Sequence, residues 1–154
     1  MKIQRIYLDT SVFGGCFDEE FAKESLLLME QIRVGKFRLV MSEAVLTELG
    51  TAPAQVQNVW ADIPKRFIET VGFNPEVEAL RQAYLEAKVV GPASANDAEH
   101  IAIATIARAD MIVSWNFKHI VHYEKIAGYL SVNLRLGYGS IGIFSPKEVV
   151  SYEN

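Results

Sequence analysis

The sequence contains little cysteine, no excess of positive charge and no long apolar run. Its one cysteine, Cys16, cannot form an internal disulfide, so nothing indicates an oxidising compartment, and we expect a small, half-buried apolar residue. A net charge of −4 excludes a basic surface over the whole protein, although a local basic patch remains compatible with it. The longest apolar stretch, around residues 101–107, is far too short to cross a bilayer, and the N-terminus lacks the apolar core of a signal peptide. We therefore expect a cytoplasmic protein without a membrane segment.

The composition is that of a folded chain: half of the 154 residues are apolar and 22% are charged. We expect residues 1–154 to form a single domain, in which strands alternate with helices. Strands are expected at 3–9, 36–41, 66–73 (at an edge of the sheet), 111–115 and 141–144; helices are expected at 18–33, 42–49, 53–62, 75–87, 97–109 and 123–136, and a loop at 10–17. This alternation predicts an α/β fold, a three-layer α/β/α sandwich around a mainly parallel central sheet.

Polar residues stand where the predicted strands end, which is where parallel sheets collect their ligands. Asp9 ends the first strand, and Glu48 lies on the helix after the second, with Glu43 as its alternative. Asp97 opens the most apolar helix, and Asn116 follows the strand at 111–115. A buried carboxylate such as Asp9 needs a compensating partner, and oxygen ligands of this kind suit hard cations such as Mg²⁺ or Mn²⁺.

Each of these residues also has a structural alternative. Asp9 would suit a cap on the following turn, Glu48 a solvated helix face, and Asn116 the start of a turn. The segment SAND, residues 94–97, fits a helix capping box that ends at Asp97. Caps at several successive strand ends would need several coincidences, so we favour the metal site. The pair in HIVH, His119 and His122, lacks further ligands for zinc.

Four segments also carry a resemblance to a known family. In order, YLDTSV, SEAVLTEL, NDAEHIAIATIARADMIVSWNFKHI and IFSPKEV resemble the PIN domain, the fold of the VapC-type toxin ribonucleases of type II toxin–antitoxin pairs. The resemblance covers nearly the whole chain. It implies that Asp9, Glu48 and Asp97 are catalytic and hold Mg²⁺ or Mn²⁺, and that they repel one another without the metal. Asn116 stands where the family often has a fourth Asp and is the fourth catalytic position, where its amide would orient a metal-bound water or coordinate weakly; the missing charge puts a second metal in doubt.

The resemblance also implies a substrate and partners. It implies a metal-dependent endoribonuclease that cleaves RNA, pairs with an antitoxin protein and forms a homodimer. Thr10 and Ser11 would help to bind metal, water or phosphate. RNA phosphates need basic residues at the rim of an acidic pocket, and the candidates are Lys118 and His119, with Arg108 and Lys125 as weaker ones. We expect Trp115 in the core and leave open whether Phe117 stacks on a base.

Three other interpretations were weighed against this one. The GYGSIG segment at 137–142 matches a dinucleotide fingerprint but follows a helix instead of a strand. A phosphotransferase of the haloacid-dehalogenase type needs a second Asp where Ser11 stands. The alternative that stays open is a degenerate PIN domain that binds RNA or a partner protein without cleavage, because Asn116 replaces an acid.

Overall fold

Five strands form one parallel sheet in the computed structural model, which describes residues 2–152. The strands are β1 (Gln4–Leu8), β2 (Phe37–Ser42), β3 (Ile68–Val71), β4 (Met111–Val113) and β5 (Gly142–Phe144). Their order across the sheet is β3-β2-β1-β4-β5. The parallel sheet and the edge position of β3 were both predicted from the sequence, and both are confirmed.

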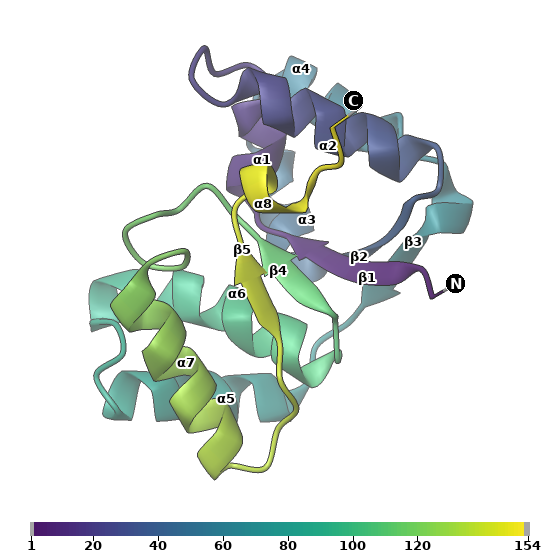
Figure 1. The fold of residues 1–154 in the computed structure, drawn as a ribbon. Coiled ribbons are helices and arrows are strands. Elements are labelled where there is room, and N and C mark those ends of the chain that lie inside the picture. Colours follow the sequence, from purple (N-terminus) through teal and green to yellow (C-terminus); the bar gives the residue numbers. More distant parts are fainter. Residues whose placement is uncertain (1, 153–154) are drawn as a thin grey trace.

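Helices cover both faces of this sheet (Figure 1). One layer consists of α5 (Pro75–Glu86), α6 (Ala95–Ile106) and α7 (Tyr123–Arg135). The other face carries α1 (Thr10–Gly15), α2 (Ala22–Arg33) and α8 (Pro146–Val149), while α3 (Glu43–Gly50) and α4 (Ala54–Ala61) contact α1. Two short 3-10 helices, η1 (Lys65–Phe67) and η2 (Pro92–Ser94), precede β3 and α6. The predicted α/β/α sandwich is therefore confirmed.

The predicted loop at 10–17 is wrong, because residues 10–15 form helix α1. Val12 and Phe13 on this helix are fully buried, and core packing of this kind stabilises a helix that local sequence does not favour. The Gly14-Gly15 pair favours a break in a helix, yet Gly15 lies inside α1, where other side chains pack closely against it. A Cβ at this position would stand 2.6 Å from Ser25 Oγ and 2.8 Å from Trp115 Nε1. The glycine therefore permits close packing here.

Helix boundaries also differ from those predicted. Helix α2 begins at Ala22 instead of residue 18, and α6 begins at Ala95, which places Asp97 in its first turn. Ser94 makes no side-chain capping hydrogen bond, so the capping box proposed for 94–97 is not formed. A capping box does open α8, which was not predicted, through Ser145 and Glu148.

Packing explains why α6 is apolar nearly all round. The helix lies in the layer below the sheet beside α5 and α7, and most of its side chains are buried. Trp115 is buried as predicted and stacks on Phe21 with ring centroids 4.3 Å apart. Cys16 is also buried, and burial raises the pKa of its thiol to about 11, which suits an inert apolar role. Among residues 2–152, no helix is long and apolar enough to span a membrane.

The order of the strands fixes where a ligand can bind. The chain builds β1, β2 and β3 toward one edge of the sheet, then crosses back so that β4 and β5 lie on the other side of β1. The carboxyl ends of β1 and β4 therefore flank the point where the direction of the connections reverses. In open parallel sheets this reversal creates the crevice in which ligands bind.

Candidate active site

Asp9 directly follows β1 at this crevice and is only 5% exposed. Its Oδ1 accepts a hydrogen bond of 2.6 Å from Ser11 Oγ, and its Oδ2 accepts one of 2.9 Å from Ser114 Oγ. The carboxylate makes no capping bond to α1, so the capping alternative is wrong. Burial raises the pKa of Asp9, and the negative charge of Asp97 adds to the rise, while the two serine hydroxyls oppose it.

Asp97 reaches the same region from the first turn of α6. Its Oδ1 accepts a hydrogen bond of 3.1 Å from Asn116 Nδ2. Burial raises the pKa of Asp97, the charge of Glu48 adds to the rise, and the histidines His119 and His100 oppose it. The charge of Asp97 acts on Asp9 and that of Glu48 acts on Asp97, so the structure brings these three acids to the same region; their catalytic role stays a prediction.

Asn116 lies beside Asp97 and donates a hydrogen bond to its carboxylate. Its amide Nδ2 faces Asp97, while its Oδ1 accepts from the backbone N–H groups of Lys118 at 3.2 Å and His119 at 2.9 Å. The residue therefore starts a turn, as one alternative proposed, and also orients a carboxylate. Its oxygen is occupied by the turn, so in this orientation it offers the site a donor in place of a fourth acid.

Glu48, on α3, is half-exposed at 44% yet held at both oxygens. Oε1 lies 2.7 Å from His100 Nε2, and Oε2 accepts a hydrogen bond of 2.8 Å from Thr10 Oγ1. The hydrogen bond with His100 lowers the pKa of Glu48 and so favours the ionised form. Glu43 is exposed and makes no side-chain hydrogen bond within the described residues, so Glu48 is the acid at this position.

His100 and Ser114 also belong to this site, although neither was predicted from the sequence. His100 is 3% exposed and lies one helical turn after Asp97, on the same face of α6. Burial acts to lower its pKa, but the hydrogen bond to Glu48 and the charges of the three acids outweigh burial and raise it. The available signal was a histidine one helical turn after Asp97, directly before the apolar run at 101–104. Ser114 had a similar signal, since it lies one residue past the end of β4.

The predicted substrate-binding residues divide into two groups. Thr10 and Ser11 lie in the site, but their hydroxyls donate to Glu48 and Asp9, so they hold the carboxylates. At the rim, Lys118 and Phe117 are exposed, and His119 is half-buried close enough to Asp97 to lower its pKa.

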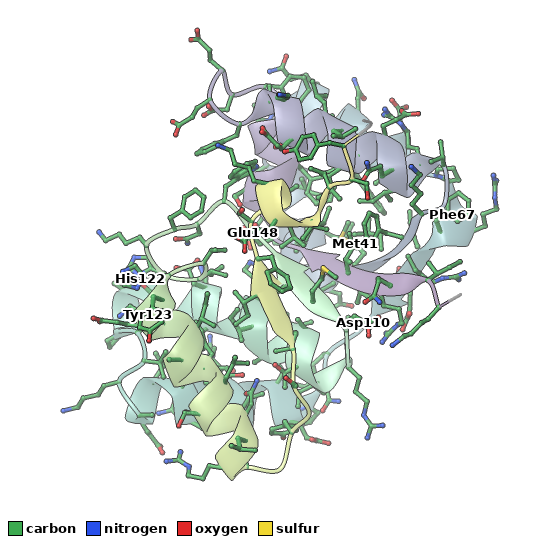
Figure 2. All side chains as sticks on the ribbon, viewed as in Figure 1. Met41, Phe67, Asp110, His122, Tyr123 and Glu148 are labelled. Atoms are coloured by element: carbon green, nitrogen blue, oxygen red, sulfur yellow. The ribbon has the colours of Figure 1, made fainter. Side chains whose placement is uncertain are left out.

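The two weaker candidates for phosphate binding do not lie free at this rim. Arg108 precedes the amino end of β4, where Arg5 donates to its carbonyl oxygen at 2.8 Å, so it lies at the opposite end of the sheet. Lys125 Nζ donates to the carbonyl oxygen of Val89 at 2.9 Å. Figure 2 shows the two ends: Asp110 lies before β4, and His122 lies across the molecule, at the start of α7.

Some of the oxygen ligands in this site suit a hard divalent cation, and others are engaged elsewhere. Asp9 and Asp97 offer carboxylate oxygens, and a bound cation would relieve the burial and repulsion that raise their pKa values. Glu48 is turned toward His100 and Thr10. Within residues 2–152, no group of three or more His, Cys, Asp or Glu side chains is arranged to hold a metal ion. Asp9 and Asp97 are therefore the two acids of the site whose carboxylates are not paired with a charged side chain, and Glu48 is engaged by His100 and Thr10.

The structure thus combines a parallel sheet, covered by helices on both faces, with acids beyond β1 and on α3 and α6. No family model and no curated protein matches the sequence.

Solved structures do match the fold. A chain in the crystal structure of FitAcB from Neisseria gonorrhoeae aligns with a TM-score of 0.58 and 12% identity, over 94% of this chain and 99% of that one. A structure of FitAB bound to an IR36 DNA fragment gives 0.58 and 12%, over 96% and 99%. VapBC2 from Rickettsia felis, bound to a DNA fragment from its promoter, gives 0.51 and 19%, over 75% and 90%. The likeness to VapC-like PIN domains is confirmed at the level of the fold.

Proposed function

We propose that this chain is a metal-dependent endoribonuclease of the VapC type, which hydrolyses phosphodiester bonds in RNA. The observation that carries the proposal is the position of two acids at the carboxyl end of the sheet: buried Asp9, held by two serine hydroxyls, and Asp97, held by the amide of Asn116. No lysine or arginine side chain within residues 2–152 forms a salt bridge with either acid. Two carboxylates that lack a lysine or arginine partner are suited to bind a cation.

The chain's own residues would prepare this site for hydrolysis. Asp9 and Asp97 would hold Mg²⁺ or Mn²⁺, which supplies an activated water and neutralises charge on the phosphate. Ser11 and Ser114 fix both oxygens of Asp9, and Asn116 fixes Asp97. Glu48, kept ionised by His100, would accept a hydrogen bond from the attacking water or hold it in line.

Basic groups at the rim would hold the RNA. An acidic crevice repels a polyanion, so the phosphates on either side of the cut need cations. Phe117, Lys118 and His119 follow Asn116 in that order, and the exposed ring of Phe117 is edge-on to that of Trp115, with centroids 6.0 Å apart. We assign phosphate contacts to Lys118 and His119 and base stacking to Phe117.

The structural neighbours also suggest partners. VapBC2 is described as bound to DNA from its own promoter, and FitAB as bound to a DNA fragment. From this structural likeness we propose that the present chain is a cytoplasmic toxin, which pairs with an antitoxin and forms a homodimer. Leu26 on α2 and Val34 just after it are exposed apolar residues that suit such a contact.

A second candidate is a PIN-like module that binds RNA or a partner protein without cutting. Asn116 favours it, because this residue gives Asp97 an amide donor where a fourth carboxylate would add charge for a cation. Metal affinity separates the two candidates, since a binding module needs no cation between Asp9 and Asp97.

The deciding experiment is cleavage of a mixed pool of single-stranded RNA by purified protein free of any antitoxin. Cleavage should require Mn²⁺ or Mg²⁺, stop with EDTA, and fall by about 100-fold or more in Asp97→Asn. Glu30→Gln on the exposed face of α2 is the matched control and should cleave as the wild type does. No cleavage by folded protein with either ion would favour the binding module, and Asn116→Asp would then test whether the missing acid is the cause.

A further inference from the structure

A buried chain of hydrogen bonds leads from the middle of the sheet to Glu48. The Nδ1 atom of His100 lies 2.7 Å from the hydroxyl of Tyr7, which lies 2.8 Å from Ser42 Oγ. Ser42 in turn accepts from the backbone N–H of Val45 at 3.2 Å, as the cap of α3. Tyr7, Ser42 and His100 are all buried, and they come from β1, β2 and α6. Three elements of the fold therefore fix the position of one imidazole ring.

The direction of the last hydrogen bond follows from the chemistry of Glu48. An ionised carboxylate only accepts hydrogen bonds, so Nε2 of His100 carries hydrogen and donates to Oε1 whether the ring is neutral or charged. Thr10 donates to the other oxygen. A half-exposed glutamate would otherwise sample several rotamers, and ordering its side chain costs conformational entropy. The two donors supply this ordering before any substrate arrives.

Stability alone does not require this arrangement. Burying a tyrosine hydroxyl and an imidazole costs desolvation, and apolar side chains of similar size in the same place are often as stable or more so. What the polar chain provides, and an apolar pair does not, is a donor aimed at one oxygen of Glu48.

We propose that His100 is the positioning residue for Glu48: held by Tyr7 and Ser42, it fixes the carboxylate at the crevice in the orientation that cleavage uses. This inference rests on the proposed nuclease function for its kinetic consequence, and on the observed hydrogen bonds for its structural one. His100 acts through Glu48 and touches neither substrate nor reacting atoms.

Two substitutions of His100 distinguish a residue that positions Glu48 from one that only fills space in the core. His100→Leu removes both ring nitrogens, whereas His100→Gln keeps an N–H close to where Nε2 stands. We expect kcat for RNA cleavage to fall about 10- to 100-fold in His100→Leu, with KM changed little, and to be largely recovered in His100→Gln. The control is His122→Gln, at an exposed histidine outside the chain of hydrogen bonds, which should match the wild type.

A double-mutant cycle tests whether the effect passes through Glu48. In a Glu48→Gln background, His100→Leu should cause no further loss of kcat, because the group that it positions has already been changed. Losses that multiply, or a His100→Gln variant as impaired as His100→Leu, would overturn the inference and leave His100 a structural residue.

Crystal structures of the variants keep this test separate from the proposed function. Glu48 should occupy one conformation in the wild type and in His100→Gln, and several in His100→Leu. If the wild type cleaves no RNA, the nuclease proposal fails while these structures still decide the positioning role. An unmoved Glu48 in His100→Leu would contradict the role even in an active nuclease. If His100→Leu does not fold, Tyr7→Phe, which removes the partner of Nδ1, should give the same disorder in milder form.

Discussion

The two ends of the sheet treat their carboxylates in opposite ways. At the amino end, Asp110 accepts hydrogen bonds of 2.7 Å from both Lys2 Nζ and the backbone N–H of Arg5. Burial acts to raise the pKa of Asp110, but these hydrogen bonds and the nearby positive charges outweigh it and lower the pKa. At the carboxyl end, hydroxyl and amide groups are the hydrogen-bond donors to Asp9 and Asp97, and both pKa values are raised.

The comparison shows where the chain supplies its own counter-charge and where it does not. The side chain of Arg5 also pairs with Glu69 at 2.6 and 2.9 Å and donates to the carbonyl oxygens of Ala107 and Arg108, so the amino end is internally neutral. At the carboxyl end, histidines are the basic groups near the acids, and no lysine or arginine of residues 2–152 pairs with Asp9 or Asp97. We propose that this difference leaves the carboxyl end able to bind a cation.

The largest effect on stability should come from removing the Arg5 side chain at the amino end of the sheet. Arg5→Met removes four side-chain hydrogen bonds and leaves Glu69 and two carbonyl oxygens without their partner. We expect the free energy of unfolding, measured in urea, to fall by about 2–3 kcal/mol. RNA cleavage per folded molecule should be unchanged. A loss below about 0.5 kcal/mol would mean that this cluster is no more than a set of solvated surface charges.

A smaller effect of opposite sign should follow at the carboxyl end. Without divalent ions, Asp97→Asn removes one of the repelling charges and should raise the free energy of unfolding at pH 7 by up to about 1 kcal/mol. Because the pKa of Asp97 is raised in the folded state, the folded protein binds more protons than the unfolded chain above pH 4, and stability falls as the pH rises. The advantage of the variant should therefore shrink toward zero below about pH 4. An advantage independent of pH would show that charge is not its cause.

Much of this could be predicted from the sequence, because the main signals are local. Alternating strands and helices indicated the parallel sheet, and polar residues at a strand end, on the helix after a strand and at the start of an apolar helix indicated Asp9, Glu48 and Asp97. Helix α1 was missed because a glycine pair usually breaks a helix, whereas here the packing around Gly15 requires a glycine. The directions in which side chains point could not be predicted either, because they too depend on tertiary packing.

Two residues illustrate what tertiary contacts decide. The hydrogen bond between His100 and Glu48 joins residues far apart in sequence, so no local pattern records it. Asn116 could have offered the site either its oxygen or its amide nitrogen, and only the turn at Lys118 and His119 settles that the nitrogen faces Asp97.

The most direct measurement is a calorimetric titration of the metal-free protein with Mn²⁺ at pH 7. The account predicts binding by the wild type, its loss in Asp97→Asn, and its retention in Asp110→Asn, which alters an acid at the neutralised amino end. Absence of binding in the wild type, or equal binding by the wild type and Asp97→Asn, would contradict the claim that the carboxyl end of the sheet is kept for a cation.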